Sequence, residues 1–117
     1  MVDNNKLKPI LKGIPTSAGI AEGAVKVISG IGDSSKFNEG DVLVTKITDP
    51  TMVIMMNQAC AVVCDIGGIT SHPSIISREL GIPCVVNVKT ATSTLKDGQK
   101  IKVNGTTGEI FLAGRIP

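Results

Sequence analysis

The stretch of sequence that decides the fold is CAVVCDIGGITSHPSIISRELGIPCVVNV, residues 60–88. Its opening run, residues 60–65, is apolar enough for a strand that is buried on both faces. A short helix is expected over residues 73–80, because Gly81 can end it in the left-handed conformation, and residues 83–88 then form the next buried strand. The pattern predicts a β-loop-α-β unit.

Further strands are expected on both sides of this unit. Residues 24–29 alternate apolar with polar side chains, and residues 41–46 form a second strand beyond a polar loop over residues 30–40. Near the end of the chain, residues 100–103 and 109–112 flank an Asn-Gly turn, which predicts an antiparallel hairpin. The sequence therefore predicts an α/β fold: a mixed sheet with a parallel core unit, short helices and a C-terminal hairpin.

A helix packed on this sheet is expected over residues 50–59. Asp49 can cap its N-terminus, and Pro50 suits its first turn. Helical spacing places apolar side chains on one face of this helix. These side chains are Met52, Met56 and Ala59, with Val53 beside them. We interpret Met52, Met55 and Met56 as residues that fill the core rather than as a soft interaction surface.

Length and composition bound the class of protein. The 117 residues fit one compact domain, in which residues 1–12 are a flexible arm or linker and residues 13–117 form the folded unit. With 42% apolar residues and only two aromatic ones, the core must be aliphatic. A net charge of +2, with no basic cluster and no aromatic platform, excludes a nucleic-acid partner.

Compartment follows from two further features. No stretch approaches the roughly 20 apolar residues that span a bilayer, and the N-terminus has no signal-peptide core, so we expect a cytoplasmic protein with no membrane partner. The three cysteines are odd in number and lie in valine-rich stretches, which favours reduced core thiols over disulfides. Cys60 and Cys64 lack a second pair of ligands, which argues against zinc.

The strongest chemical signal lies between the predicted strand and helix, where the single histidine of the chain stands. Glycines let the backbone approach a bound group closely, and a helix N-terminus favours an anion. Pro73 suits the first helical position, which puts His72 at or next to the cap with its imidazole outside the helix. We expect a phosphate-binding site that uses Gly67, Gly68, Thr70, Ser71 and Ser74.

Histidine is suited to be the nucleophile of such a site. An imidazole with a pKa of about 6.5 is mostly neutral at pH 7 and keeps a ring nitrogen lone pair that can attack phosphorus. The N–P bond that forms is labile, which suits a group that is taken up and handed on. From these residues alone, a helix cap or a satisfied polar histidine is the more common alternative.

Residues 67–88, GGITSHPSIISRELGIPCVVNV, closely resemble the active-site signature of the mobile domain of phosphoenolpyruvate-utilising enzymes. This family includes pyruvate phosphate dikinase, phosphoenolpyruvate synthase and enzyme I of the sugar phosphotransferase system. Three flanking blocks, residues 13–28, 40–50 and 96–111, resemble the same family in the same order. The resemblance covers nearly all of the chain after residue 12.

The resemblance implies a swivelling β/β/α phosphohistidine domain in which His72 is transiently phosphorylated. In this family the domain carries the phosphoryl group between a nucleotide-binding, ATP-grasp-like domain and a barrel domain that binds phosphoenolpyruvate or pyruvate. Mg²⁺, ATP and phosphoenolpyruvate are then expected on partner domains, in cis or in trans, and no cofactor or metal on this one. Thr70 matches a threonine that is a target of regulatory phosphorylation in some dikinases. Such a chain is a component of a phosphotransferase and not a complete enzyme.

The sequence makes two departures from the family pattern. Pro73-Ser74 stands where many members have two alanines, and Asn87 stands where a glycine commonly follows the valine pair. Neither change removes the nucleophile, and proline is compatible with a helix start.

Other roles stay open beside these. Helical geometry places Glu79 near the His72 face and turns Arg78 away, so for both we favour solvated surface or an inter-domain contact over the alternative of phosphate binding. An alternative of a different functional class is a binding or structural module of the same architecture that forms no phosphohistidine. Phosphorylation of His72 would separate the two hypotheses.

Overall fold

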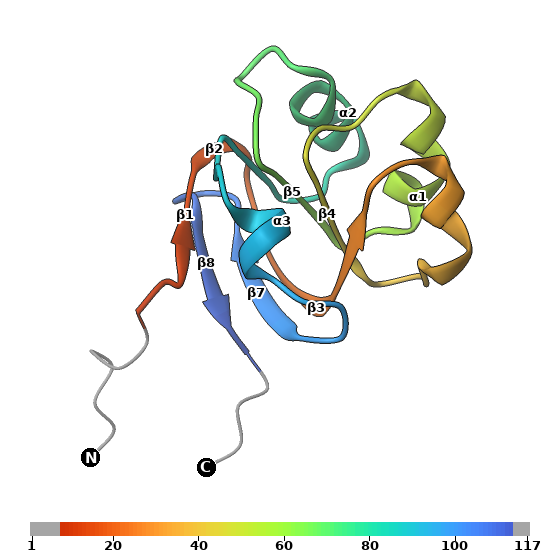
Figure 1. The fold of residues 1–117 in the computed structure, drawn as a ribbon. Helices are drawn as coiled ribbons and strands as arrows, with labels where there is room; N and C mark the ends of the chain where they lie inside the picture. The colour runs from red at the N-terminus through yellow and green to blue at the C-terminus, as the bar shows by residue number, and fades with distance from the viewer. Residues whose placement is uncertain (1–7, 114–117) are drawn as a thin grey trace.

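The computed structural model describes residues 8–113, which form a mixed α/β molecule built on one sheet (Figure 1). The strands are β1 (Leu11–Lys12), β2 (Ile14–Ser17), β3 (Ile20–Ile28), β4 (Val42–Thr45), β5 (Ala61–Cys64), β6 (Cys84–Val86), β7 (Lys100–Asn104) and β8 (Glu109–Leu112). The helices are α1 (Val53–Gln58), α2 (His72–Leu80) and α3 (Ala91–Thr94), with 3₁₀ turns at Ile31–Lys36 and Pro50–Met52. The order across the eight-stranded sheet is β1-β8-β7-β3-β4-β5-β6-β2.

The parallel half of the sheet consists of β3, β4, β5 and β6. Every residue of β4, β5 and β6 is buried, as expected for apolar strands between two layers. One face packs against α1 and α2, and the opposite face packs against α3 (Figure 1). The methionines of the α1 segment are buried in the first of these layers. The predicted β-loop-α-β unit and the assignment of these methionines to the core are both confirmed.

β3 joins the parallel half to the antiparallel half. Residues 25–28 pair in parallel with β4, whereas residues 20–24 pair antiparallel with β7. β7 and β8 form the predicted hairpin. Its turn is closed by the Asn104 carboxamide oxygen, which accepts the N–H groups of Thr106 and Thr107 at 3.0 and 3.1 Å.

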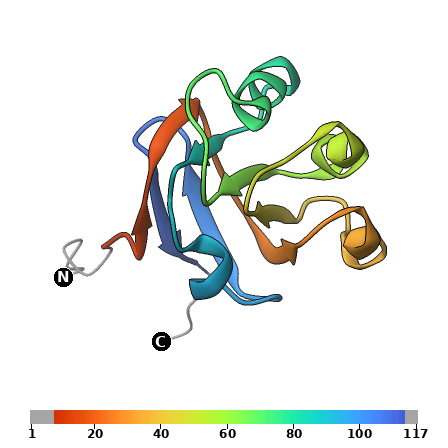
Figure 2. The ribbon, with the colours of Figure 1, turned by 45° about the horizontal axis from the view of Figure 1, so that its top comes forward.

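One extended segment closes the sheet into a near-barrel. β1 pairs with β8 and β2 pairs with β6, so residues 11–17 bridge the two edges (Figure 2). Gly13 lies at the crossing point between β1 and β2, and its N–H donates to Gly108 O at 2.8 Å. A side chain does not fit at this position, because a Cβ would lie 2.4 Å from Val86 O. Residues 11 and 12 of the expected arm are thus part of the sheet, and residues 1–7 lie outside the described residues.

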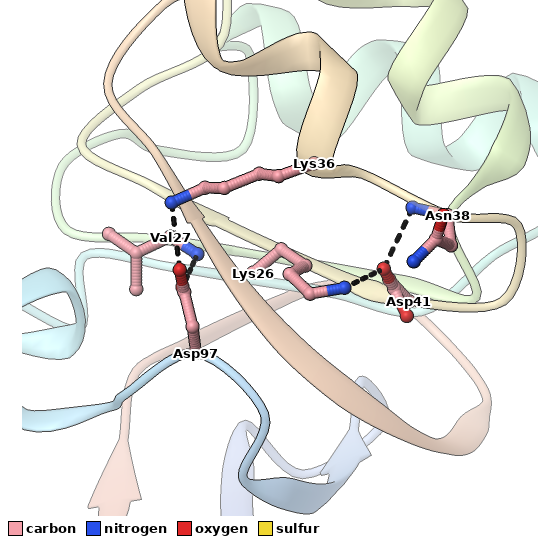
Figure 3. Close-up of polar contacts among 6 residues, drawn as sticks. All are labelled: Lys26, Val27, Lys36, Asn38, Asp41 and Asp97. Carbon is pink, nitrogen blue, oxygen red and sulfur yellow. Dashed lines mark hydrogen bonds and ion pairs between the residues drawn. The ribbon is translucent and has the colours of Figure 1, made fainter.

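Two aspartates anchor the connection between β3 and β4 (Figure 3). The Asp41 carboxylate accepts hydrogen bonds from the ammonium group of Lys26 at 2.7 Å and from the backbone N–H of Asn38 at 2.8 Å. Asp97, which follows α3, accepts the N–H of Val27 at 2.7 Å and the ammonium group of Lys36 at 2.8 Å. These contacts join the connection to β3 and to the segment that follows α3.

The structure differs from the sequence-based expectation in several elements. The expected loop over residues 30–40 contains a 3₁₀ turn and buries Phe37. The strand expected at residues 24–29 begins at residue 20, because its first half pairs with the distant β7. The expected helix over residues 50–59 begins as a 3₁₀ turn. α3 was not predicted, since four residues are too few for a periodic signal.

Candidate functional site

The candidate site lies at the carboxyl end of the parallel strands, in the connection between β5 and α2 (Figure 1). The chain leaves β4 toward Thr48 and leaves β5 toward Gly67 and Gly68. The two connections are tied together, because Ile66 N–H donates to Lys46 O at 3.1 Å. Loops from neighbouring parallel strands meet at this edge, which is where α/β sheets commonly bind ligands.

His72 is the first residue of α2, and Ser71 stands at the N-cap position without a side-chain hydrogen bond to the helix. Pro73 therefore stands at the second helical position, one residue later than predicted; the first-turn N–H groups have no intrahelical acceptor, so proline fits there as well. The imidazole is half-buried, and its Nδ1 lies 2.7 Å from Thr48 Oγ1. No hydrogen bond to Nε2 is formed within residues 8–113.

Thr48 belongs to the candidate site, and sequence reasoning missed it. Its side chain is only 3% exposed, so the hydroxyl that meets His72 is held in place by its surroundings. The sequence indicated only a helix start at this point, and nothing in it relates Thr48 to a residue 24 positions away. The pairing depends on the parallel alignment of β4 and β5.

The loop before α2 is pinned at Gly68. Ser71 Oγ donates to Gly68 O at 2.8 Å and accepts Gly68 N–H at 3.1 Å. The fully buried Ser74 Oγ donates to the same carbonyl at 2.7 Å. In this structure these two hydroxyls, which the sequence suggested as phosphate donors, hold the loop instead. Thr70 is exposed at its tip, and its hydroxyl has no hydrogen-bond partner in the described chain.

Gly67 is required by the same arrangement. Its φ of +133° lies in a region that side chains rarely adopt, and a Cβ there would approach Ser71 Oγ to 2.8 Å. Nothing lies within 4 Å of a Cβ built on Gly68, so that side of the loop is open. The structure thus brings the predicted glycines, hydroxyls and histidine into one connected loop and helix start.

Arg78 reaches back along α2 to the loop. Its Nη1 donates to Thr16 O and its Nη2 to Ile69 O, both at 2.8 Å. The guanidinium group therefore joins the strand that closes the sheet to the loop before His72. Arg78 is exposed, which agrees with the surface position expected for it, and it makes these two hydrogen bonds in addition.

One charged group near the histidine is Asp49. Asp49 caps the 3₁₀ turn by accepting Thr51 N–H at 2.8 Å. Hydrogen bonds from the Thr51 hydroxyl and N–H, with a smaller contribution from His72, hold the pKa of the Asp49 carboxyl below its ordinary value. No group of three or more His, Cys, Asp or Glu side chains suited to a metal gathers in residues 8–113.

The cysteines lie in the core rather than in the site. Cys64 and Cys84 are fully buried, as predicted, whereas Cys60 is partly exposed. Burial raises the pKa of all three thiols, most strongly that of Cys64. A raised pKa disfavours the reactive thiolate form of each of these side chains. Separately, no helix within residues 8–113 combines the length and apolar character needed to cross a bilayer.

The backbone conformation at Asn87 explains why asparagine stands there in place of the family's glycine. Its φ is 57°, in the left-handed region that glycine enters freely and asparagine enters more readily than other side chains. The position follows β6, where the backbone must turn beside the glycine loop. Asparagine therefore replaces glycine with the least strain.

The fold and site together define a class of protein: a mixed α/β domain that presents a single histidine at a helix start beside a pinned glycine loop. Comparison with known families is specific. Residues 37–108 match the model of the PEP-utilising enzyme, mobile domain. The chain belongs to this family.

Relatives and solved structures agree with this assignment. A protein named probable phosphoenolpyruvate synthase from Archaeoglobus fulgidus is 51% identical over 93% of this chain, which spans only 14% of that relative. The solution structure of an Enzyme I protein matches 66% of this chain with a TM-score of 0.57 and 30% identity, over 32% of that chain. Aconitase X from Thermococcus kodakaraensis shares the fold alone, with a TM-score of 0.64 and 20% identity over 87% of this chain and 96% of its own.

Proposed function

We propose that the chain is a swivelling phosphoryl carrier domain in which His72 accepts a phosphoryl group on Nε2 and hands it on. The observation that carries this proposal is the contact of 2.7 Å between Thr48 Oγ1 and His72 Nδ1. A hydrogen bond at one ring nitrogen selects the tautomer and leaves the other nitrogen to act. When Nδ1–H donates to Thr48, Nε2 holds the lone pair.

The transfer step then follows from the ring geometry. The Nε2 lone pair forms a bond to phosphorus, the bond from phosphorus to the donor oxygen breaks, and its electron pair leaves with that oxygen. The proton on Nδ1 remains on the ring, and Nδ1–H continues to donate a hydrogen bond to Thr48 Oγ1. The open side of Gly68 and the exposed Thr70 leave space at the loop for the phosphoryl oxygens. Gly67, Ser71 and Ser74 support this site by shaping the loop.

The donor and acceptor belong to other domains. Because this chain spans 14% of its relative named phosphoenolpyruvate synthase, the remainder of such a protein has room for the catalytic domains. We infer that an ATP-grasp-like nucleotide domain and a phosphoenolpyruvate- or pyruvate-binding barrel are the two partners. Mg²⁺, ATP and phosphoenolpyruvate would be bound there, and this domain would move between them.

The test supplies the missing domains in trans. A phosphoenolpyruvate synthase without its matching segment is incubated with this chain, Mg²⁺ and phosphoenolpyruvate. Intact-mass analysis is expected to show one added phosphoryl group that is acid-labile and base-stable, and His72→Ala should abolish it. Lys100→Gln, an exposed substitution on β7 outside the site, is the control and should still be modified.

The alternative is a binding or structural module without phosphohistidine. The fold permits it, since proteins of low identity and another name share the architecture. Two results would favour that alternative. Either the wild-type chain and the His72→Ala chain gain the phosphoryl group to the same extent, or neither chain gains it.

A further inference from the structure

We propose that Arg78 is a positioning residue for the phosphoryl group on His72, because it fixes the direction of the Ile69–Thr70 peptide. This inference rests on the proposed function of His72. Neither the family resemblance nor the helical spacing indicates a positioning role for Arg78. The role is inferred from the hydrogen bonds that its guanidinium group makes.

Side chains of the α2 segment hold two successive carbonyl groups of the loop. The hydroxyls of Ser71 and Ser74 both donate to Gly68 O. Arg78 Nη2 donates to the next carbonyl, Ile69 O, at 2.8 Å. Its Nη1 is anchored at Thr16 O in β2, so the guanidinium group braces the loop against the closed sheet.

The direction of the carbonyls sets the direction of the N–H groups. In a planar trans peptide the C=O and the following N–H point in opposite directions. With the carbonyls of Gly68 and Ile69 turned toward α2 side chains, the N–H groups of Ile69 and Thr70 are directed away from them. Neither N–H has an acceptor among residues 8–113. Successive N–H groups without acceptors are suited to bind the oxygens of an anion.

Charge adds to this arrangement. The side-chain ion pairs within the described part of the chain are Lys26–Asp41 and Lys36–Asp97, so no carboxylate neutralises Arg78. Its positive charge stays at the loop that precedes the histidine. Lysine keeps the charge but lacks the rigid fork that spans two carbonyls, so the two contributions can be separated by mutation.

The experiment uses the full chain and a small reagent, phosphoramidate, so that no partner domain is needed. The phosphorus–nitrogen bond of the reagent breaks, the bond from Nε2 to phosphorus forms, and ammonia leaves with its electron pair. The half-life of the product is followed by ³¹P NMR for the wild-type chain, Arg78→Lys and Arg78→Met. Lys100→Gln, which removes one exposed positive charge from β7, is the matched control. Urea unfolding of each variant measures its stability separately.

In the wild-type chain, phosphorylation should shift the backbone amide signals of Ile69 and Thr70 strongly. Both Arg78 variants should lose most of this shift and should shorten the half-life roughly tenfold. This is less than the ~hundredfold effect of removing an oxyanion donor outright, because the N–H groups remain but lose their fixed direction. Lys100→Gln should match the wild type in both respects.

Two results would overturn the inference. One is a folded Arg78→Lys chain with reduced stability but an unchanged half-life and amide shift, which would make the residue merely structural. The other is a wild-type chain that is phosphorylated on His72 without any shift at Thr70. Failure of His72 to accept the group at all would instead refute the proposed function.

Discussion

At the scale of single residues, the proposed chemistry depends on a hydroxyl that the sequence does not mark. Thr48 meets Nδ1 of His72, and its burial keeps the contact in place. Thr48→Val conserves shape but leaves both ring tautomers available, so fewer molecules present the Nε2 lone pair. We expect the rate of phosphorylation by phosphoramidate to fall several-fold, and stability to fall by about 1 kcal/mol for the lost hydrogen bond. The control is Thr51→Val, which removes an exposed hydroxyl that contacts Asp49. This variant should be phosphorylated at the wild-type rate.

Asn87 shows how backbone conformation restricts a residue. Because its φ is positive, Asn87→Gly should leave the free energy of unfolding nearly unchanged. Asn87→Val should lower it by about 2 kcal/mol, since a β-branched side chain is strained in the left-handed region. Urea denaturation of the two variants gives the comparison. Equal stability of the two variants would contradict the assigned conformation.

At the scale of elements, the segment that closes the sheet depends on the contact at Gly13. A Cβ there would lie 2.4 Å from Val86 O, so β1 and β2 could not both keep their partners in Gly13→Ala. We expect a loss of roughly 2 kcal/mol or more, as for other overpacked sites. The matched control is Gly32→Ala, because nothing lies within 4 Å of a Cβ at that glycine. Hydrogen exchange of β8 and β6 amides should rise in the first variant and not in the second.

At the scale of the whole molecule, acidification should weaken the link between the connection after α3 and β3. Hydrogen bonds from Lys36 and from Val27 N–H hold the pKa of the Asp97 carboxyl below its ordinary value of 3.8. The depressed pKa means that this contribution to stability is present above pH 3.8 and is lost as the pH falls through the folded-state pKa. Asp97→Asn and Lys36→Met should both reduce the fall in urea midpoint below about pH 4. An acid dependence equal to that of the wild type in both variants would contradict this account.

The sequence by itself determined the elements whose signals are local. The apolar run of β5, the glycine that ends α2, the asparagine-glycine turn of the hairpin and the position of His72 at a helix start all follow from neighbouring residues, and the structure agrees to within a residue or two. The family also follows from the sequence, because its motif is contiguous.

Only the tertiary structure decided which distant groups meet. The parallel register of β4 and β5 brings Thr48 to His72, the crossing at Gly13 closes the sheet, and Arg78 joins Thr16 to Ile69. Each of these contacts joins segments that the order of residues does not relate. They form because a sheet aligns the ends of its strands in space, and a linear pattern contains no record of that alignment.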